Sequence, residues 1–144
     1  MFSLRKNRLL NNIFKINCKN IISFQPENIF YLTGFWGEGI VLINQNTTKL
    51  YIPKLEYFRA QQDSKDCEII KTERGNNGLA SIISELNDND YYCIDNTSYN
   101  IINQLKEKIG QNKIIVNEEP FFQTRSIKDE SEINNIIKAA NIID

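Results

Sequence analysis

The fold of this chain is decided by the stretch Asn28-Ile29-Phe30-Tyr31-Leu32-Thr33-Gly34-Phe35, with Trp36-Gly37-Glu38-Gly39 directly after it. Bulky residues run into a glycine turn just before an apolar run of strand length at 39–43. Pro26 fits the first turn of a short helix, and Gly34 is suited to end that helix because glycine readily adopts a left-handed conformation. The stretch therefore predicts a short helix, a tight turn and a strand.

Strand and helix signals alternate on both sides of this stretch. An amphipathic helix is expected at 2–14, with Ser3 as its cap, and a strand at 21–24. Apolar runs at 39–43 and 49–52, with turn residues between them, predict a hairpin. Further helices are expected at 53–60, from a cap at Asn77 to Leu86, and from a cap at Thr97 or Ser98 to Ile109. Strands are expected at 67–71, 91–94 and 113–116. The fold class is therefore α/β, with a mixed β-sheet flanked by helices and partly parallel.

The last part of the sequence predicts a helix with an unusually apolar face. Asp129 and Glu132 have the spacing of a capping box. The helix that they open carries one apolar stripe, formed by Ile133, Ile136, Ile137, Ala140 and Ile143. Such a stripe needs a surface to pack against. We therefore expect a domain over residues 1–124, then a linker and first helix over residues 125–144 that lead to an absent catalytic domain.

Composition narrows the function classes. The 144 residues carry a formal net charge of −1, which argues against nucleic acid as a partner. We interpret the basic cluster Arg5-Lys6-Arg8 as a solvated helix face. No apolar run approaches the roughly 20 residues that span a bilayer, so no membrane partner is expected. The three cysteines, Cys18, Cys67 and Cys93, are widely spaced, and Cys67 and Cys93 lie in apolar runs that suit buried thiols. The pattern indicates a reduced, cytoplasmic protein.

The sequence contains no histidine. This excludes Ser-His-Asp and Cys-His catalysis and imidazole metal ligands within the chain. The acidic residues Asp88, Asp90, Asp95, Glu118 and Glu119 allow a hard-cation site, but turn and cap roles explain them better. We therefore predict no catalytic and no metal-binding residue in this chain.

The glycines at 34–39 follow the order GxxGxG, which is reversed from the dinucleotide fingerprint, and no P-loop lysine follows. A glycine turn that allows close backbone approach is the preferred interpretation. Phe35 and Trp36 leave two alternatives open. They are either core residues or an exposed aromatic anchor at a subunit contact or substrate rim.

Four blocks of the chain carry a resemblance to a known family. Residues 28–35 read N-I-x-Y-L-T-G-F, and residues 50–57 with Ala60 read L-Y-x-P-x-L-E-x followed by Ala. Residues 125–133 read R-x-I-K-x-x-x-E-I, and Ala139-Ala140 with Ile142 come after them. In this order the blocks resemble the N-terminal domain of the creatinase/prolidase family and, within it, archaeal-type Xaa-Pro dipeptidases. Other members have Asp-x-Arg-Tyr in the second block. Only Tyr57 of that pattern is present, so no role of its Asp or Arg is carried over.

The resemblance implies a ribonuclease-H-like domain of a homodimeric metallopeptidase, either an Xaa-Pro dipeptidase (prolidase) or an aminopeptidase. In that family two divalent metal ions, Mn, Co or Zn, are held by two Asp, one His and two Glu of the C-terminal domain. No cofactor is therefore expected in this chain. The implied partners are its own C-terminal catalytic domain, a second subunit and, through the parent protein, proline-containing peptides.

In such proteins the N-terminal domain helps to form the dimer and rims an active site, often that of the neighbouring subunit. The candidates here for substrate-rim or dimer contacts are Phe35, Trp36, Glu38, Tyr57 and Arg125. The alternative function is a stand-alone, peptidase-like interaction module without catalysis. The reading frame after Asp144 distinguishes the two. The sequence leaves open the metal and the choice between dipeptidase and aminopeptidase.

Overall fold

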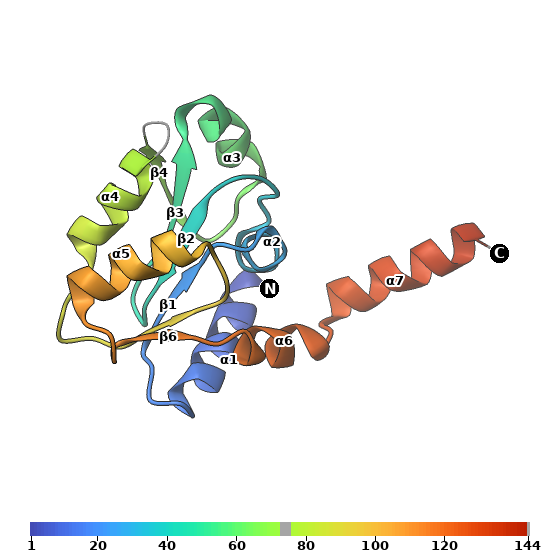
Figure 1. Ribbon diagram of the computed structural model, residues 1–144. Helices are drawn as coiled ribbons and strands as arrows, with labels where there is room; N and C mark the ends of the chain where they lie inside the picture. Colours follow the sequence, from blue (N-terminus) through green and yellow to red (C-terminus); the bar gives the residue numbers. More distant parts are fainter. Residues whose placement is uncertain (73–75, 144) are drawn as a thin grey trace.

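The computed structural model describes residues 1–72 and 76–143, in which one six-stranded sheet lies between two layers of helices (Figure 1). The strands are β1 (Asn20–Ser23), β2 (Ile40–Ile43), β3 (Thr48–Pro53), β4 (Glu68–Thr72), β5 (Tyr92–Ile94) and β6 (Ile114–Val116). The helices are α1 (Phe2–Phe14), α2 (Pro26–Thr33), α3 (Tyr57–Asp63), α4 (Asn76–Glu85), α5 (Tyr99–Ile109), α6 (Glu119–Ser126) and α7 (Glu130–Ile143). A 3-10 turn, η1 (Lys54–Glu56), joins β3 to α3.

The strand order across the sheet is β4-β3-β2-β1-β5-β6. The first three strands form an antiparallel meander, and β5 pairs parallel with β1. β6 continues the parallel part beyond β5, and β4 pairs parallel with β3 at the other edge. The meander followed by parallel strands is the ribonuclease-H-like arrangement. The predicted α/β fold with a mixed, helix-flanked sheet is confirmed.

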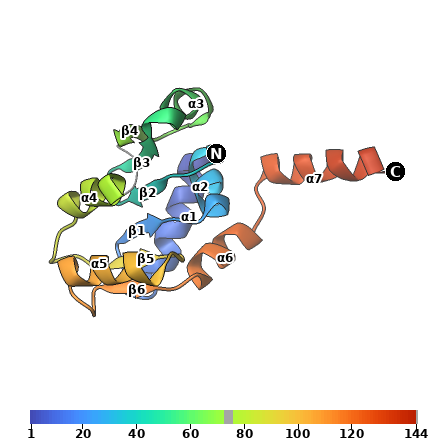
Figure 2. The same cartoon turned by 45° about the horizontal axis from the view of Figure 1, so that its top comes forward.

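Alternation of side chains along the strands divides the core between the two faces of the sheet. On one face Ile21, Ile43 and Cys93 belong to a core shared with α1, α2 and α6. On the other face Ile22 and Ile94 pack with α4 and α5. Figure 2 shows these helices on opposite sides of the sheet. The central strands are therefore covered on both faces, as parallel pairing requires.

Helix α2 ends as its sequence predicts. Pro26 lies in its first turn, and Gly34 follows it with a φ of 83°. The N–H of Gly34 donates to the carbonyl oxygen of Phe30 at 2.8 Å, which closes the last turn. A Cβ at Gly34 would lie 3.0 Å from the carbonyl oxygen of Asp63. Glycine is therefore required here both by the backbone conformation and by the close approach of α3.

Some local predictions were wrong. No side-chain hydrogen bond caps α1, which begins at Phe2, so Ser3 is not its cap. Helix α6 was not expected, although Pro120 in its first turn is a usual start signal. Leu55 of η1 and Phe58 of α3 are each 74% exposed, because this short helical segment lies at the sheet edge, where Ala60 is its buried residue. For α4, residues 73–75 before it lie outside the described residues, so its cap is not described.

Helix α7 extends away from the layered part of the molecule (Figures 1 and 2). Its apolar residues Ile133, Ile136 and Ile137 are about half exposed. Among residues 1–72 and 76–143, no helix combines the length and the apolar character that crossing a bilayer requires.

Candidate functional site

Phe35 and Trp36 are neighbours in sequence but lie in opposite environments. The Phe35 ring is fully buried in the core beneath α2, whereas Trp36 is 54% exposed. The backbone N–H of Phe35 donates to Oγ1 of Thr33 at 3.2 Å, which fixes the turn after α2. Of the two alternatives for these residues, Phe35 is a core residue, and an exposed anchor is possible only for Trp36. The indole of Trp36 contacts the ring of Phe30 edge to face, with centroids 5.9 Å apart.

Helix α3 holds the turn from the other side through Arg59. Its Nη1 donates to the carbonyl oxygen of Trp36 at 2.8 Å, and its guanidinium lies 4.6 Å from the centroid of Phe35. Tyr57 belongs to the same helix, but its ring is covered by Lys71 of β4, with Nζ 4.9 Å from the ring centroid. Arg59 was not a candidate from the sequence, because one Arg on an exposed helix face carries no pattern that marks it.

Glu38 lies on the sheet side of the same turn. It is exposed and lines a cavity of about 270 Å³ with Gly39, Thr72 and Thr97 at the ends of the strands. The structure thus separates the candidates. Trp36 is exposed and Phe35 lies in the core, whereas Glu38 lines a cavity and the Tyr57 ring lies against Lys71.

Arg125 lies in the last turn of α6 and not in the linker where it was expected. Its guanidinium lies 5.3 Å from the centroid of Phe122, and its carbonyl oxygen accepts a hydrogen bond from Nζ of Lys128. Arg125 also lines a cavity of about 480 Å³ between α1, α2, α6 and α7. Phe30 lines this cavity too and contacts Trp36, so the aromatic turn and the start of α7 belong to one continuous surface.

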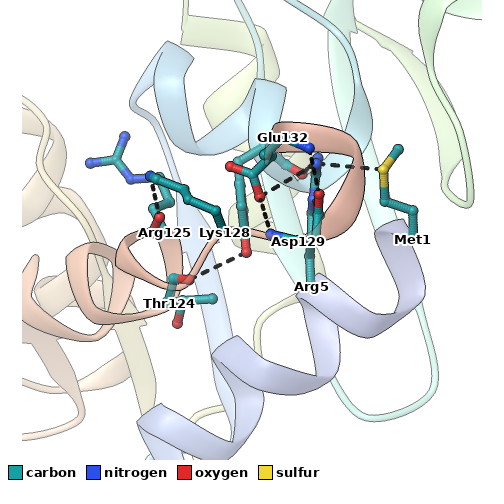
Figure 3. A network of polar contacts seen from close by, with 8 residues as sticks. Met1, Arg5, Thr124, Arg125, Lys128, Asp129 and Glu132 are labelled. Carbon is teal, nitrogen blue, oxygen red and sulfur yellow. Dashed lines mark hydrogen bonds and ion pairs between the residues drawn. The ribbon is translucent and has the colours of Figure 1, made fainter. Parts of the chain in front are cut away.

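A buried arginine joins α1 to the start of α7 (Figure 3). Arg5 is 7% exposed, and its Nε donates to Oδ2 of Asp129 at 2.7 Å. Its Nη1 donates to the carbonyl oxygen of Tyr31 at 2.9 Å, and its Nη2 lies 3.6 Å from Oε1 of Glu132. The interpretation of Arg5 as part of a solvated face is therefore wrong. The spacing of Phe2, Arg5 and Leu9 would have placed Arg5 on the buried side of α1.

Asp129 and Glu132 form the predicted capping box. Oδ1 of Asp129 accepts from the N–H of Glu132 at 2.9 Å, and Oε1 of Glu132 accepts from the N–H of Asp129 at 3.4 Å. The hydrogen bond from Arg5 keeps the pKa of Asp129 below its ordinary value. The negative charge therefore persists at the N-terminus of α7, where the helix dipole favours it.

Asp95 is a fully buried carboxylate with a structural role. Its two oxygens accept hydrogen bonds from side chains and backbone N–H groups of the β1–α2 connection and from its own neighbour, namely Ser23, Phe24, Gln25, Asn28 and Asn96. The turn and cap role expected for Asp95 in its own segment accounts for the N–H of Asn96 alone, and the other donors lie 67 to 72 residues earlier. With its lone pairs used in this way, Asp95 is not available to a cation.

The other acidic residues do not assemble a metal site either. Asp90 belongs to a turn after α4, in which its N–H donates to the carbonyl oxygen of Asn87. Glu119 lies in the first turn of α6. In the part of the chain that the structure describes, no three carboxylates or thiols converge as metal ligands. These residues do not fit a pair of divalent ions.

The strand order and helix layers define an α/β domain of ribonuclease-H-like topology. Residues 5–127 match the Creatinase/Prolidase N-terminal domain, so the chain belongs to that family.

Proteins with similar sequence or structure align with nearly the whole chain. It is 26% identical over 143 residues to the Xaa-Pro dipeptidase of Pyrococcus furiosus, and this covers 97% of the chain but 40% of the relative. The solved prolidase of Pyrococcus furiosus superposes with a TM-score of 0.77 at 25% identity, over 95% of this chain and 42% of that one. The prolidase of Pyrococcus horikoshii gives a TM-score of 0.78 at 22% identity, over 96% of this chain and 40% of that one. The chain thus spans about 40% of the length of these relatives.

Proposed function

We propose that this chain is the non-catalytic N-terminal domain of a metal-dependent Xaa-Pro dipeptidase or aminopeptidase. The observation that carries the proposal is the alignment of 97% of the chain with 40% of an Xaa-Pro dipeptidase. The remaining part of such a protein would supply the catalytic domain and the ligands for two divalent ions, Mn, Co or Zn. A bound metal would supply the activation of water for hydrolysis. The residues of this chain would contribute shape and position.

The first positional role is contact with a second subunit and with the rim of an active site. The exposed Trp36 supports it, because aromatic residues are enriched at the energetic centres of interfaces. Leu55 and Phe58 support it as well, because a soluble domain rarely leaves such large side chains uncovered together. Glu38, Tyr57 and Arg125 are further candidates. Phe35 would act from within the core by supporting Trp36.

The second positional role is the attachment of the catalytic domain. Helix α7 leaves the domain where Arg5 binds Asp129, and Ile133, Ile136 and Ile137 of its apolar stripe remain exposed. If a catalytic domain packs on this stripe, the ion pair between Arg5 and Asp129 would determine how that domain is oriented. The three free cysteines support a reducing compartment, and we place the protein in the cytoplasm.

The test compares the whole gene product with residues 1–144 in the hydrolysis of Xaa-Pro dipeptides and longer Xaa-Pro peptides, with Mn, Co or Zn added. We expect hydrolysis by the whole product alone, and dimers in light scattering that Trp36→Ala and Phe58→Ala weaken. Surface substitution Lys106→Ala, on α5, is the control. Hydrolysis by residues 1–144 would refute the non-catalytic assignment. A reading frame that stops after Asp144 would favour the interaction module instead.

A further inference from the structure

Arg59 joins α3 to the turn that carries Trp36. Among the hydrogen bonds and ring contacts of the described residues, those between α3 and this turn all come from Arg59. It donates to the carbonyl oxygen of Trp36 at 2.8 Å and lies over the ring of Phe35 at 4.6 Å. One planar side chain therefore binds the backbone of the exposed aromatic residue and covers the buried one. Both contacts use the guanidinium, which stacks and donates at once, whereas an ammonium group does not stack.

Two carboxylates on the same helical segment orient this guanidinium. Oε2 of Glu56 lies 2.7 Å from Nη2 of Arg59 and accepts from its Nε at 2.9 Å. Oδ2 of Asp63 lies 3.9 Å from Nη1, one helical turn further on. The Arg59 side chain is 44% exposed, and ion pairs at such positions contribute little stability. Their effect is to hold the guanidinium in one orientation.

The sequence of the turn is adapted to this side chain. A Cβ at Gly37 would lie 2.6 Å from Nη2 of Arg59 and 2.8 Å from Cζ of Phe35. Only a residue without a side chain lets the turn pass this close to both groups. The position of the Trp36 backbone is therefore determined by Arg59 on one side and by Phe35 below.

We propose that Arg59 is a positioning residue that sets the direction of the Trp36 indole. The proposal rests on the proposed function of Trp36 at the rim of an active site or subunit contact. Arg59 itself touches no substrate. It acts by keeping the carbonyl of Trp36 in place, so that the indole meets the ring of Phe30 edge to face and presents its other side outward.

Trp36 is the only tryptophan in the 144 residues, so its fluorescence reports directly on this turn. The experiment measures time-resolved anisotropy and acrylamide quenching of Trp36 in Arg59→Gln, Arg59→Lys and Lys54→Gln. Lys54 is an exposed cation of the adjacent η1 turn and serves as the matched control. We expect faster nanosecond depolarisation and stronger quenching in Arg59→Gln. Arg59→Lys should show the same loss, and Lys54→Gln should match wild type.

The thermal midpoint separates positioning from ordinary stabilisation. Because the ion pairs are exposed, Arg59→Gln should leave the midpoint almost unchanged while the indole becomes mobile. Unchanged anisotropy and quenching in folded Arg59→Gln would overturn the proposal, as would equal changes in Lys54→Gln. If circular dichroism shows that Arg59→Gln does not fold, the anisotropy and quenching of Arg59→Lys test the proposal by the same criteria.

Peptidase kinetics of the whole gene product test separately whether Arg59 affects substrate binding at the rim. Arg59→Gln should raise KM for a longer Xaa-Pro peptide more than it lowers kcat, because the rim binds substrate without taking part in the reaction. If Arg59→Gln makes the Trp36 indole mobile in the anisotropy measurement but leaves KM unchanged, the role of Arg59 at the substrate rim is overturned. Absence of any peptidase activity in the wild-type product would contradict the proposed function, while the fluorescence result for Arg59 would stand.

Discussion

Arg5 and Asp129 are 124 positions apart in sequence, yet Nε of Arg5 donates to Oδ2 of Asp129 at 2.7 Å. The two side chains are 8% and 10% exposed. The pair joins the first helix to the residue that caps the last one. It therefore determines how α7 leaves the layered domain.

Replacing Arg5 by Met keeps an apolar stem of similar length and removes the guanidinium. We expect a loss of about 2–3 kcal/mol in the free energy of unfolding, because a buried carboxylate and the Tyr31 carbonyl lose their donor. Urea denaturation measures it. Lys6→Met, at the next position of the same helix, should change the free energy by no more than about 0.5 kcal/mol. Equal losses in the two variants would contradict a specific role of Arg5.

The same pair predicts a pH dependence of stability. The pKa of Asp129 is lowered in the folded state, first by the hydrogen bond from Arg5. The folded state thus binds fewer protons at this group, so its contribution is complete above the unfolded pKa of about 4. It is lost as the pH falls through the lower, folded pKa. Asp129→Asn keeps a capping side chain but not the charge, so its unfolding free energy should fall less between pH 5 and pH 3 than that of wild type. Parallel pH curves for the two proteins would refute this assignment.

Asp95 offers a second test of a buried carboxylate. Its oxygens accept from Ser23, Asn28 and three backbone N–H groups, so Asp95→Asn replaces an acceptor by a donor that faces other donors. We expect a loss of about 3 kcal/mol or more in the free energy of unfolding. Asp88→Asn, at an exposed turn position, is the control. Hydrogen exchange should also become faster in the β1–α2 connection, and an unchanged rate there would contradict the role given to Asp95.

Periodicity and turn chemistry were enough to predict the layered α/β fold, because both are written in neighbouring residues. The helix from Pro26 to Gly34 and the capping box at Asp129 are examples. Contacts between distant segments leave weaker marks. Arg5 looked like a surface cation because its partner lies at the other end of the chain. Its helical spacing from Phe2 and Leu9 was the available signal.

In the candidate site, too, local features were predictable from the sequence and contacts between distant segments were not. The glycine turn was predicted, but the sequence alone does not tell which of Phe35 and Trp36 faces the core. That choice depends on Thr33, which fixes the turn, and on Arg59, which covers Phe35 from another helix. Exposure of Leu55 and Phe58 likewise follows from the position of α3 at the sheet edge. No local pattern records that position.

The cysteines should be unreactive in the folded protein. Burial raises the pKa of Cys93 to about 12 and that of Cys67 to about 11. At pH 8 only about one thousandth of Cys67 is then thiolate, and the thiolate is the reacting form. We expect slow reaction with Ellman's reagent in the native state and rapid reaction of all three thiols in urea. Cys67→Ser should remove the fastest native phase, because Cys67 is the half-buried thiol of the three. Rapid native reaction of Cys18 or Cys93 would contradict the burial described here.

Gly37→Ala tests the fit of the aromatic turn against Arg59. Its new Cβ would collide with Nη2 of Arg59 and with the buried ring of Phe35, so we expect a loss of about 1–3 kcal/mol in the free energy of unfolding. Arg59→Gln shortens one colliding group and leaves the other in place. In a double-mutant cycle the combined variant should therefore be more stable than the sum of the single losses predicts. Strict additivity would mean that the Phe35 ring alone limits residue 37. A coupling free energy above about 0.5 kcal/mol would place Arg59 in direct contact with the turn.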